Sequence, residues 1–133
     1  MTSIKPLLTA IRDSIPAIPG WQYFEYQADA DASPPWIVTS ISLMDRITTE
    51  AGVPTAGTGR LEVRVTAFTE MSVNVTADLL DMTGQQVHAP GFLIGALVPD
   101  IDSGVYAAPL SSDITSQRIP TRVMRYTFTW SRL

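Results

Sequence analysis

TRVMRYTFTWS, residues 121–131, is the strongest strand signal in the chain. Large apolar side chains alternate with shorter or charged ones, which is the two-residue period of a β-strand with one buried face. The segment therefore predicts a strand that forms part of the core. Its two faces carry Met124, Tyr126, Phe128 and Trp130 on one side, and Val123, Arg125, Thr127 and Thr129 on the other.

Two earlier segments show the same period. In RLEVRVTAFT, residues 60–69, apolar side chains alternate cleanly with polar or charged ones, and WIVTSISL, residues 36–43, follows a similar pattern. This signature is typical of an antiparallel sheet with one face in the core. WQYFEY, residues 21–26, predicts a further short strand.

The C-terminal half holds weaker strand signals. FLIGALVPDI, residues 92–101, is apolar, but Gly95 and Pro99 interrupt it, so it predicts an edge or bulged strand. Residues 103–118 are polar and predict a loop, with a short strand at residues 105–107.

Between two of the strands lies RITTEAGVPTAGTGR, residues 46–60. It holds Gly52, Pro54, Gly57 and Gly59 and almost no large apolar side chain. Glycine and proline interrupt regular structure, so the segment predicts a long flexible loop. Loops beyond ~12–15 residues in a compact domain are usually functional or disordered.

Two segments change to the helical period. Residues 3–15 predict a helix that Ser3 can cap and that ends before Pro16. Residues 70–83 predict a second helix, with Glu70 in the first turn, where the helix dipole favours negative charge, and with Gly84 as its stop. The apolar stripes that indicate these helices are Ile4, Leu7, Leu8, Ile11 and Ile15 in the first, and Met71, Val75, Leu79 and Met82 in the second.

The order of these elements defines the expected fold class. It is α+β, with an antiparallel or mixed β-sheet, an N-terminal helix and a central helix packed on one face of the sheet, and a long, β-hairpin-like arm. A chain of 133 residues with 45% apolar residues fits a single domain, residues 1–133.

Composition narrows the class of function. The formal net charge is −4 and the basic residues are scattered, whereas nucleic-acid binders usually show a basic footprint. No apolar run approaches the ~18–20 residues of a membrane span, so no membrane partner is expected. The N-terminus lacks the features of a signal peptide, and the chain has no cysteine, which excludes disulfides and thiolate metal sites.

The sequence offers no convincing catalytic set. The single histidine, His88, has no evident partner. The carboxylate pairs Asp78 with Asp81 and Asp100 with Asp102 lack further ligands nearby, so a solvated surface is the expected role. Residues 52–60 resemble a phosphate-binding loop only faintly, because the required Lys and Ser/Thr are absent and a strand follows. We therefore expect no enzyme activity, cofactor or metal.

The arrangement of elements and several short motifs resemble the tail terminator and related neck, or tail completion, proteins of long-tailed bacteriophages. The resemblance covers nearly the whole chain. Four motifs carry it: one at the start of the second strand, one in the strand before the central helix, one within that helix and one in the last strand. The matching residues, in the same order, are Pro35, Ile37 and Val38; Val63, Val65, Ala67 and Phe68; Ala77 and Leu80; and Arg122, Tyr126 and Phe128.

The resemblance implies a structural protein of the virion, made in the bacterial cytoplasm. It would form a homohexameric ring at the head-proximal end of the tail tube, end tube polymerisation and offer a surface for head–tail joining. Its partners would be further copies of itself, the tail tube protein and a head-completion or connector protein. DNA would pass through the ring without specific binding.

We expect residues 45–59 to act as an arm that contacts a neighbouring subunit or the tail tube, and outward charges to pair across the ring interface. Alternatives remain another neck component, such as a stopper or adaptor, and a small-ligand-binding α+β module. A stopper should be nearly all β, and a ligand-binding module should have a concave apolar pocket. The candidate interaction residues are Asp45, Arg46, Glu50, Pro54, Arg60, Glu62, Arg64, Phe68, Arg122 and Arg125.

Overall fold

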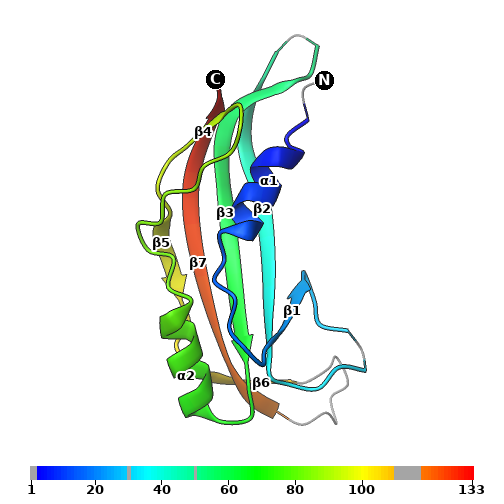
Figure 1. The fold of residues 1–133 in the computed structure, drawn as a ribbon, viewed down its shortest axis with the longest axis vertical. Helices are drawn as coiled ribbons and strands as arrows, with labels where there is room; N and C mark the ends of the chain where they lie inside the picture. The colour runs from blue at the N-terminus through cyan, green and yellow to red at the C-terminus, as the bar shows by residue number, and fades with distance from the viewer. Residues whose placement is uncertain (1–2, 30, 50, 110–117) are drawn as a thin grey trace.

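The computed structural model describes residues 3–29, 31–49, 51–109 and 118–133, and it has a mixed α+β fold (Figure 1). A strand-rich, curled sheet and two helices make up the described part of the chain. The elements are α1 (Lys5–Asp13), β1 (Gln22–Glu25), β2 (Trp36–Thr48), β3 (Pro54–Thr66), α2 (Glu70–Leu79), β4 (Phe92–Ile94), β5 (Val98–Asp102), β6 (Tyr106–Pro109) and β7 (Arg118–Arg132).

The last strand, β7, organises the sheet. The strand order is β1-β2-β3-β7-β4, and β5 and β6 also pair with β7. The pairs β2–β3 and β3–β7 are antiparallel, whereas β1 runs parallel to β2, so the sheet is mixed. The strand predicted at residues 121–131 is confirmed, and it begins earlier than predicted because residues from Arg118 onward pair with β6.

The long loop predicted at residues 46–60 is wrong. Strand β2 continues to Thr48 and β3 begins at Pro54, so the two strands form a long hairpin. The link between them is short, and the backbone N–H of Thr49 donates a hydrogen bond to the carbonyl of Val53 across it.

The glycines that suggested the loop serve the strand instead. Gly59 pairs with Phe128, and a Cβ at Gly59 would lie 2.2 Å from Cζ of the Phe128 ring. Gly57 pairs with Trp130, where a Cβ would come within 3.2 Å of the indole nitrogen. Two aromatic rings of β7 therefore lie across the glycine positions of β3, an arrangement that covers glycine in a strand.

A β-bulge interrupts the hairpin near its tip. The register shifts between Met44 and Ile47, so that Asp45 and Arg46 together lie opposite Gly57. Asp45 has a φ of 48°, the left-handed region that few residues adopt. Bulges bend a strand and increase its twist.

Both predicted helices are present. The buried face of α2, however, is not the face that carries the apolar stripe from which the helix was predicted. Thr69 caps α2 by accepting a hydrogen bond from the backbone N–H of Ser72, and Val73, Thr76 and Ala77 are its buried residues. Three members of the predicted stripe, Met71, Val75 and Leu79, have exposed fractions of 77%, 55% and 61%, whereas the fourth, Met82, is buried beyond the end of the helix, which stops at Leu79 and not at residue 83.

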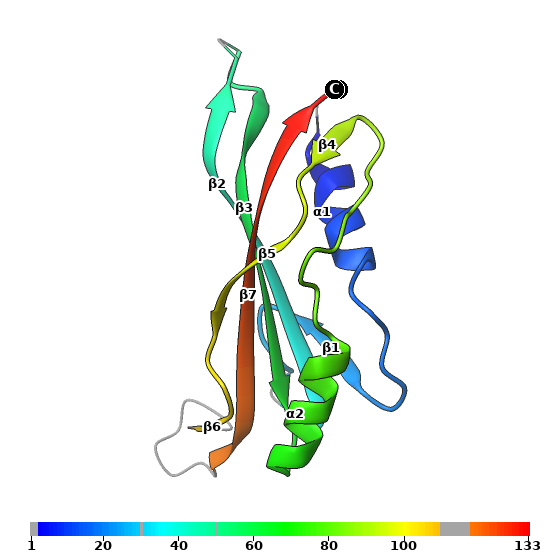
Figure 2. The same cartoon turned by 90° about the vertical axis from the view of Figure 1, so that its left-hand side faces the viewer.

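The core lies between one face of the sheet and the two helices. Figure 2 shows α1 and α2 on the same side of the long strands. Leu7 and Ile11 of α1 join the same apolar cluster as Val73 and Ala77 of α2. From the sheet, the cluster takes Ile37, Leu61, Val63, Val65, Met124, Tyr126, Phe128 and Trp130.

The strand predicted at residues 92–101 is divided into β4 and β5, each pairing with β7. The break falls near Gly95, whose backbone N–H donates to the carbonyl of Thr129. The register of β5 shifts between Pro99 and Ile101. The short strand predicted at residues 105–107 corresponds to β6, and residues 110–117 of the predicted loop lie outside the described residues.

Candidate functional site

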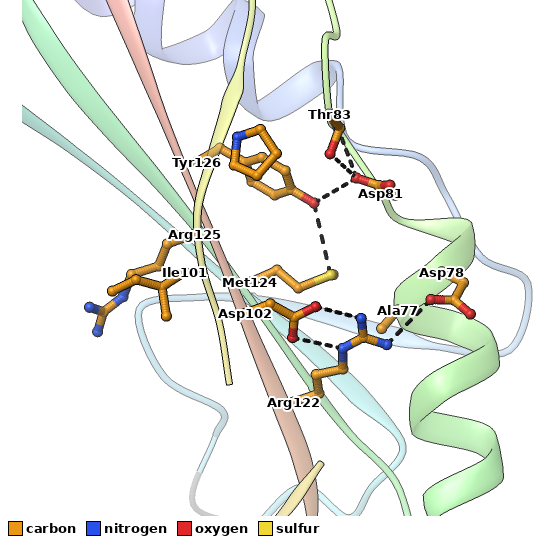
Figure 3. Close-up of a pocket in the computed structure, with 11 residues that line it drawn as sticks. Ala77, Asp78, Asp81, Thr83, Ile101, Asp102, Arg122, Met124, Arg125 and Tyr126 are labelled. Carbon is orange, nitrogen blue, oxygen red and sulfur yellow. Dashed lines mark hydrogen bonds and ion pairs between the residues drawn. The ribbon is translucent and has the colours of Figure 1, made fainter. Parts of the chain in front are cut away.

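A polar cluster ties α2 to β5 and β7 (Figure 3). Its centre is Arg122 of β7, whose guanidinium makes a two-point contact with Asp102 of β5, with Nε–Oδ1 at 3.0 Å and Nη2–Oδ2 at 2.6 Å. Nη1 of Arg122 also lies 3.3 Å from Oδ1 of Asp78 on α2. Paired arginine–carboxylate bonds of this kind are strong and directional. The bonds from Arg122 hold the pKa of Asp102 below its ordinary value.

A second set of polar contacts lies beside this ion pair. The Tyr126 hydroxyl donates to Oδ1 of Asp81 at 3.1 Å and accepts from the backbone N–H of Met82 at 3.1 Å. Thr83 donates to the same Asp81 oxygen from its hydroxyl and its backbone N–H, and these bonds lower the pKa of Asp81. Burial raises the pKa of Tyr126. The tyrosine therefore fixes the segment just after α2 to the sheet.

The chemistry open to this cluster is limited. The cavity beside it has a volume of about 110 Å³, well below the roughly 300–1,000 Å³ of ligand pockets. Asp78, Asp81 and Asp102 accept hydrogen bonds from residues of the chain itself. Among the described residues, no group of three His, Cys, Asp or Glu side chains could hold a metal ion. The contacts support a structural tether between the helix and the sheet.

Three arginines gather on the opposite face of the sheet. Arg60 and Arg64 of β3 and Arg125 of β7 flank Glu62, which pairs directly with Arg125 in the register. Arg122 faces α2, whereas Arg125 lies an odd number of residues along the strand and therefore points to the other side. Figure 3 agrees, with Arg125 directed away from the Arg122–Asp102 pair. We call Arg60, Glu62, Arg64 and Arg125 the arginine face.

The arginine face is incompletely neutralised. Glu62 lies 3.6 Å from Arg64 and 3.8 Å from Arg125, and Asp100 lies 3.9 Å from Arg60. These distances are too long for strong hydrogen bonds. The Nε atoms of all three arginines are buried, and none has a hydrogen-bond partner among the described residues. Three guanidinium groups thus share two loosely placed carboxylates.

Apolar side chains border the arginine face. Ile101 pairs with Arg125 and Val98 with Thr127, so both side chains of β5 point to this face of the sheet. Tyr106 of β6 pairs with Thr121 and points the same way. Their exposed fractions are 46%, 56% and 42% in that order. Arginine beside aromatic and aliphatic side chains is a composition typical of protein interfaces.

On the other side of the molecule, α2 presents an apolar row that begins just before the helix. Met71, Val75 and Leu79 recur at four-residue intervals along the helix, and Phe68, which precedes the helix, is 60% exposed. We call these four residues the α2 stripe. The only charged residues within α2 are Glu70 and Asp78, both acidic. Contiguous exposed apolar surface on a small protein usually marks an interaction site.

The predicted interaction residues fall into separate regions. Asp45 and Arg46 form the hairpin bulge, Pro54 begins β3 and accepts a hydrogen bond from Arg132, and Glu50 lies outside the described residues. Phe68 belongs to the α2 stripe. Arg122 faces α2 and is bonded within the chain. The structure brings together the arginine face: Arg60, Glu62, Arg64 and Arg125.

Sequence reasoning missed the exposure of Met71, Val75 and Leu79, and the role of β5 and β6 beside the arginines. A second stripe on the helix was visible in the sequence, because Val73, Ala77 and Leu80 recur at helical spacing. All three of these side chains are buried. His88 is exposed on the segment between α2 and β4.

No protein-family model matches the chain, and no curated protein matches its sequence. Within the described residues, neither helix has the length and apolar character needed to cross a membrane.

Proposed function

We propose that this chain is a tail terminator, a structural virion protein that forms a ring at the head-proximal end of a bacteriophage tail tube. The ring ends polymerisation of the tube and provides the surface to which the head is joined. The chain is made in the bacterial cytoplasm and ends up in the neck of the virion, and DNA passes through the ring without specific binding.

The residues that carry the resemblance support this proposal through their positions. Ile37 and Val38 lie near the start of β2, Val63 and Val65 lie in β3, and Ala77 lies in α2; all five are buried. Tyr126 and Phe128 are likewise buried in β7. These buried motif residues define packing rather than chemistry, and the motif residues Ala67, Phe68 and Leu80 lie just outside β3 and α2.

The observation that carries the proposal is the α2 stripe. Four large apolar side chains of a small domain remain at least half exposed, three along one side of α2 and Phe68 just before it. Burying apolar surface contributes roughly 25 cal/mol per Å², so a partner that covers the stripe gains affinity from it. A chain that works by assembly needs such a surface.

The long hairpin supplies a second element suited to assembly. Strands β2 and β3 remain paired out to Thr48 and Pro54, beyond the last paired residue of β3 with β7, which is Ala56. We propose that this end of the hairpin is the arm that contacts a neighbouring subunit or the tail tube.

The experiment that tests the proposal measures tube length. Tail-tube and tape-measure proteins from the same phage are expressed with and without this chain, and tubes are measured by negative-stain electron microscopy. We expect tubes of uniform length with the chain and overlong tubes without it. Equal length distributions in both samples would contradict the proposal.

A ligand-binding module is the second candidate, because a hollow of about 840 Å³ lies at one end of the sheet, lined in part by Trp36, Val38 and Tyr106. Its volume is within the range of ligand pockets. Native mass spectrometry of the purified chain tests this hypothesis. A mass that includes a bound small molecule supports it, and the mass of the chain alone counts against it.

A further inference from the structure

We propose that the α2 stripe of one copy of this chain docks on the arginine face of the next copy, in a head-to-tail contact. The α2 stripe is Phe68, Met71, Val75 and Leu79, and the apolar border of the arginine face is Val98, Ile101 and Tyr106. This inference rests on the proposed ring, and it names the two surfaces that build it.

The first argument is that the two surfaces lie on opposite sides of one sheet. Arg122 of β7 bonds to Asp78 of α2, whereas Arg125 of the same strand belongs to the arginine face. The α2 stripe therefore cannot reach the arginine face within one molecule. A contact between them joins two copies through unlike surfaces, and repeated contacts of that kind close into a ring or extend into a filament.

The second argument is charge complementarity. The α2 side of the molecule carries four carboxylates, Glu70, Asp78, Asp81 and Asp102, around one guanidinium, Arg122. On the opposite side, the arginine face and its nearest further carboxylate, Asp100, bring three guanidinium groups together with two carboxylates; Asp29 lies farther along that side, in a hollow that Arg64 also lines. The first surface is net negative and the second net positive, so docking of one on the other brings opposite charges together.

The third argument is the match of apolar and polar parts. Each surface combines exposed apolar side chains with a net charge of one sign. Interfaces commonly have an apolar centre, with arginine and aromatic residues enriched. The side chains of Arg60, Arg64 and Arg125 are 39%, 42% and 35% exposed, so an incoming carboxylate can reach them even though their Nε atoms are buried.

The test uses the absence of cysteine from the chain, because a thiol introduced by mutation is then unique. Val75→Cys marks the α2 stripe and Ile101→Cys marks the border of the arginine face; both positions are exposed. The two full-length variants are treated with a short thiol-specific cross-linker, separately and mixed, in the presence of polymerised tail tubes. Thr9→Cys, on the exposed side of α1, is the matched control.

We expect the mixture of Val75→Cys and Ile101→Cys to give a covalent dimer, and neither variant alone to do so. The double variant should give a ladder of products that ends at the closed ring. Thr9→Cys mixed with Ile101→Cys should give none. A second measurement, on Arg125→Glu, should show self-association weakened by roughly tenfold or more, because a like charge then faces the acidic helix.

Two results overturn the inference while leaving the proposed function standing. One is a Val75→Cys variant that cross-links to itself, which indicates a contact between like surfaces. The other is a mixture that yields no dimer although electron microscopy shows rings on the tube ends. Failure of the proposed function looks different, because the unmodified chain then leaves tube length unchanged.

Discussion

At the scale of single residues, the glycines of β3 show how a side chain on another strand decides local structure. Gly57 and Gly59 suggest flexibility when only their neighbours in sequence are considered. Their partners across the sheet are Trp130 and Phe128, and those rings occupy the space that a Cβ would need. The glycines and the aromatic residues are both visible in the sequence. Their pairing depends on the register between β3 and β7, which are far apart in the chain.

Substitution of Gly59 by alanine should destabilise the fold. The new methyl group would lie 2.2 Å from the Phe128 ring, so the ring or the strand must move. Overpacking of this kind typically costs about 1–3 kcal/mol in the free energy of unfolding, measured by urea denaturation. In a Phe128→Leu background the additional cost should shrink. An unchanged unfolding midpoint for Gly59→Ala would show that Phe128 does not lie across Gly59.

The ion pair of Arg122 with Asp102 predicts a pH dependence of stability. The folded state lowers the pKa of Asp102, mainly through its bonds to Arg122, and the pKa of Asp81, mainly through Thr83. Stabilisation from a lowered carboxyl pKa is present above the unfolded value and is lost as the pH falls towards the folded value. Urea midpoints should therefore fall as the pH drops below the ordinary value of 3.8.

The control for this pH dependence is Asp102→Asn, which should be less stable at neutral pH and lose less on acidification. Parallel pH profiles for the variant and the unmodified chain would mean that Asp102 contributes nothing to the acid sensitivity.

At the scale of elements, the sequence predicted which segments are helices and strands better than it predicted which faces they bury. The period-two pattern of β7 is strong because large side chains on one face all enter the core. In α2, by contrast, Met71, Val75 and Leu79 are exposed, whereas Val73 and Ala77 are buried. Both sets of residues recur at helical spacing, so periodicity alone does not decide which of them packs on the sheet.

The two faces of α2 predict opposite responses to matched substitutions. Val73→Ser removes a fully buried side chain and adds a hydroxyl to the core, so it should lower the free energy of unfolding by about 1–3 kcal/mol. Val75→Ser, at an exposed position two residues away, should leave it within about 0.5 kcal/mol. Thermal and urea unfolding of the two variants measure this difference. Equal losses would place both side chains in the core.

The hairpin arm can be tested by a change that leaves its paired strands intact. Residues from Ala56 onward pair with β7, so a deletion that reaches them would damage the sheet. Replacing residues 49–53 by an Asn-Gly turn shortens only the tip. We expect an unchanged circular dichroism spectrum and melting temperature, together with overlong tubes in the length assay. Tubes of normal length would show that the tip of the hairpin is not needed to end tube polymerisation.

At the scale of the whole molecule, the candidate site was only partly visible in the sequence. The sequence predicted that Glu62, Arg64, Arg122 and Arg125 are outward charges. The structure brings Glu62, Arg64 and Arg125 together on one face, but the prediction is wrong for Arg122, which faces α2. Alternation could not tell which outward face they share, nor that Arg122 belongs with α2. The apolar border formed by Val98 and Ile101 depends on the pairing of β5 with β7, which no local pattern indicates.

The central claim is that copies of this chain close into a ring on the end of a tail tube. Cryo-electron microscopy of tube ends, assembled with the full-length chain, tests it most directly. The account predicts a single closed ring at one end of each tube, with α2 of every copy seated on the sheet of its neighbour. Bare tube ends, or single copies scattered along the tube wall, would contradict it.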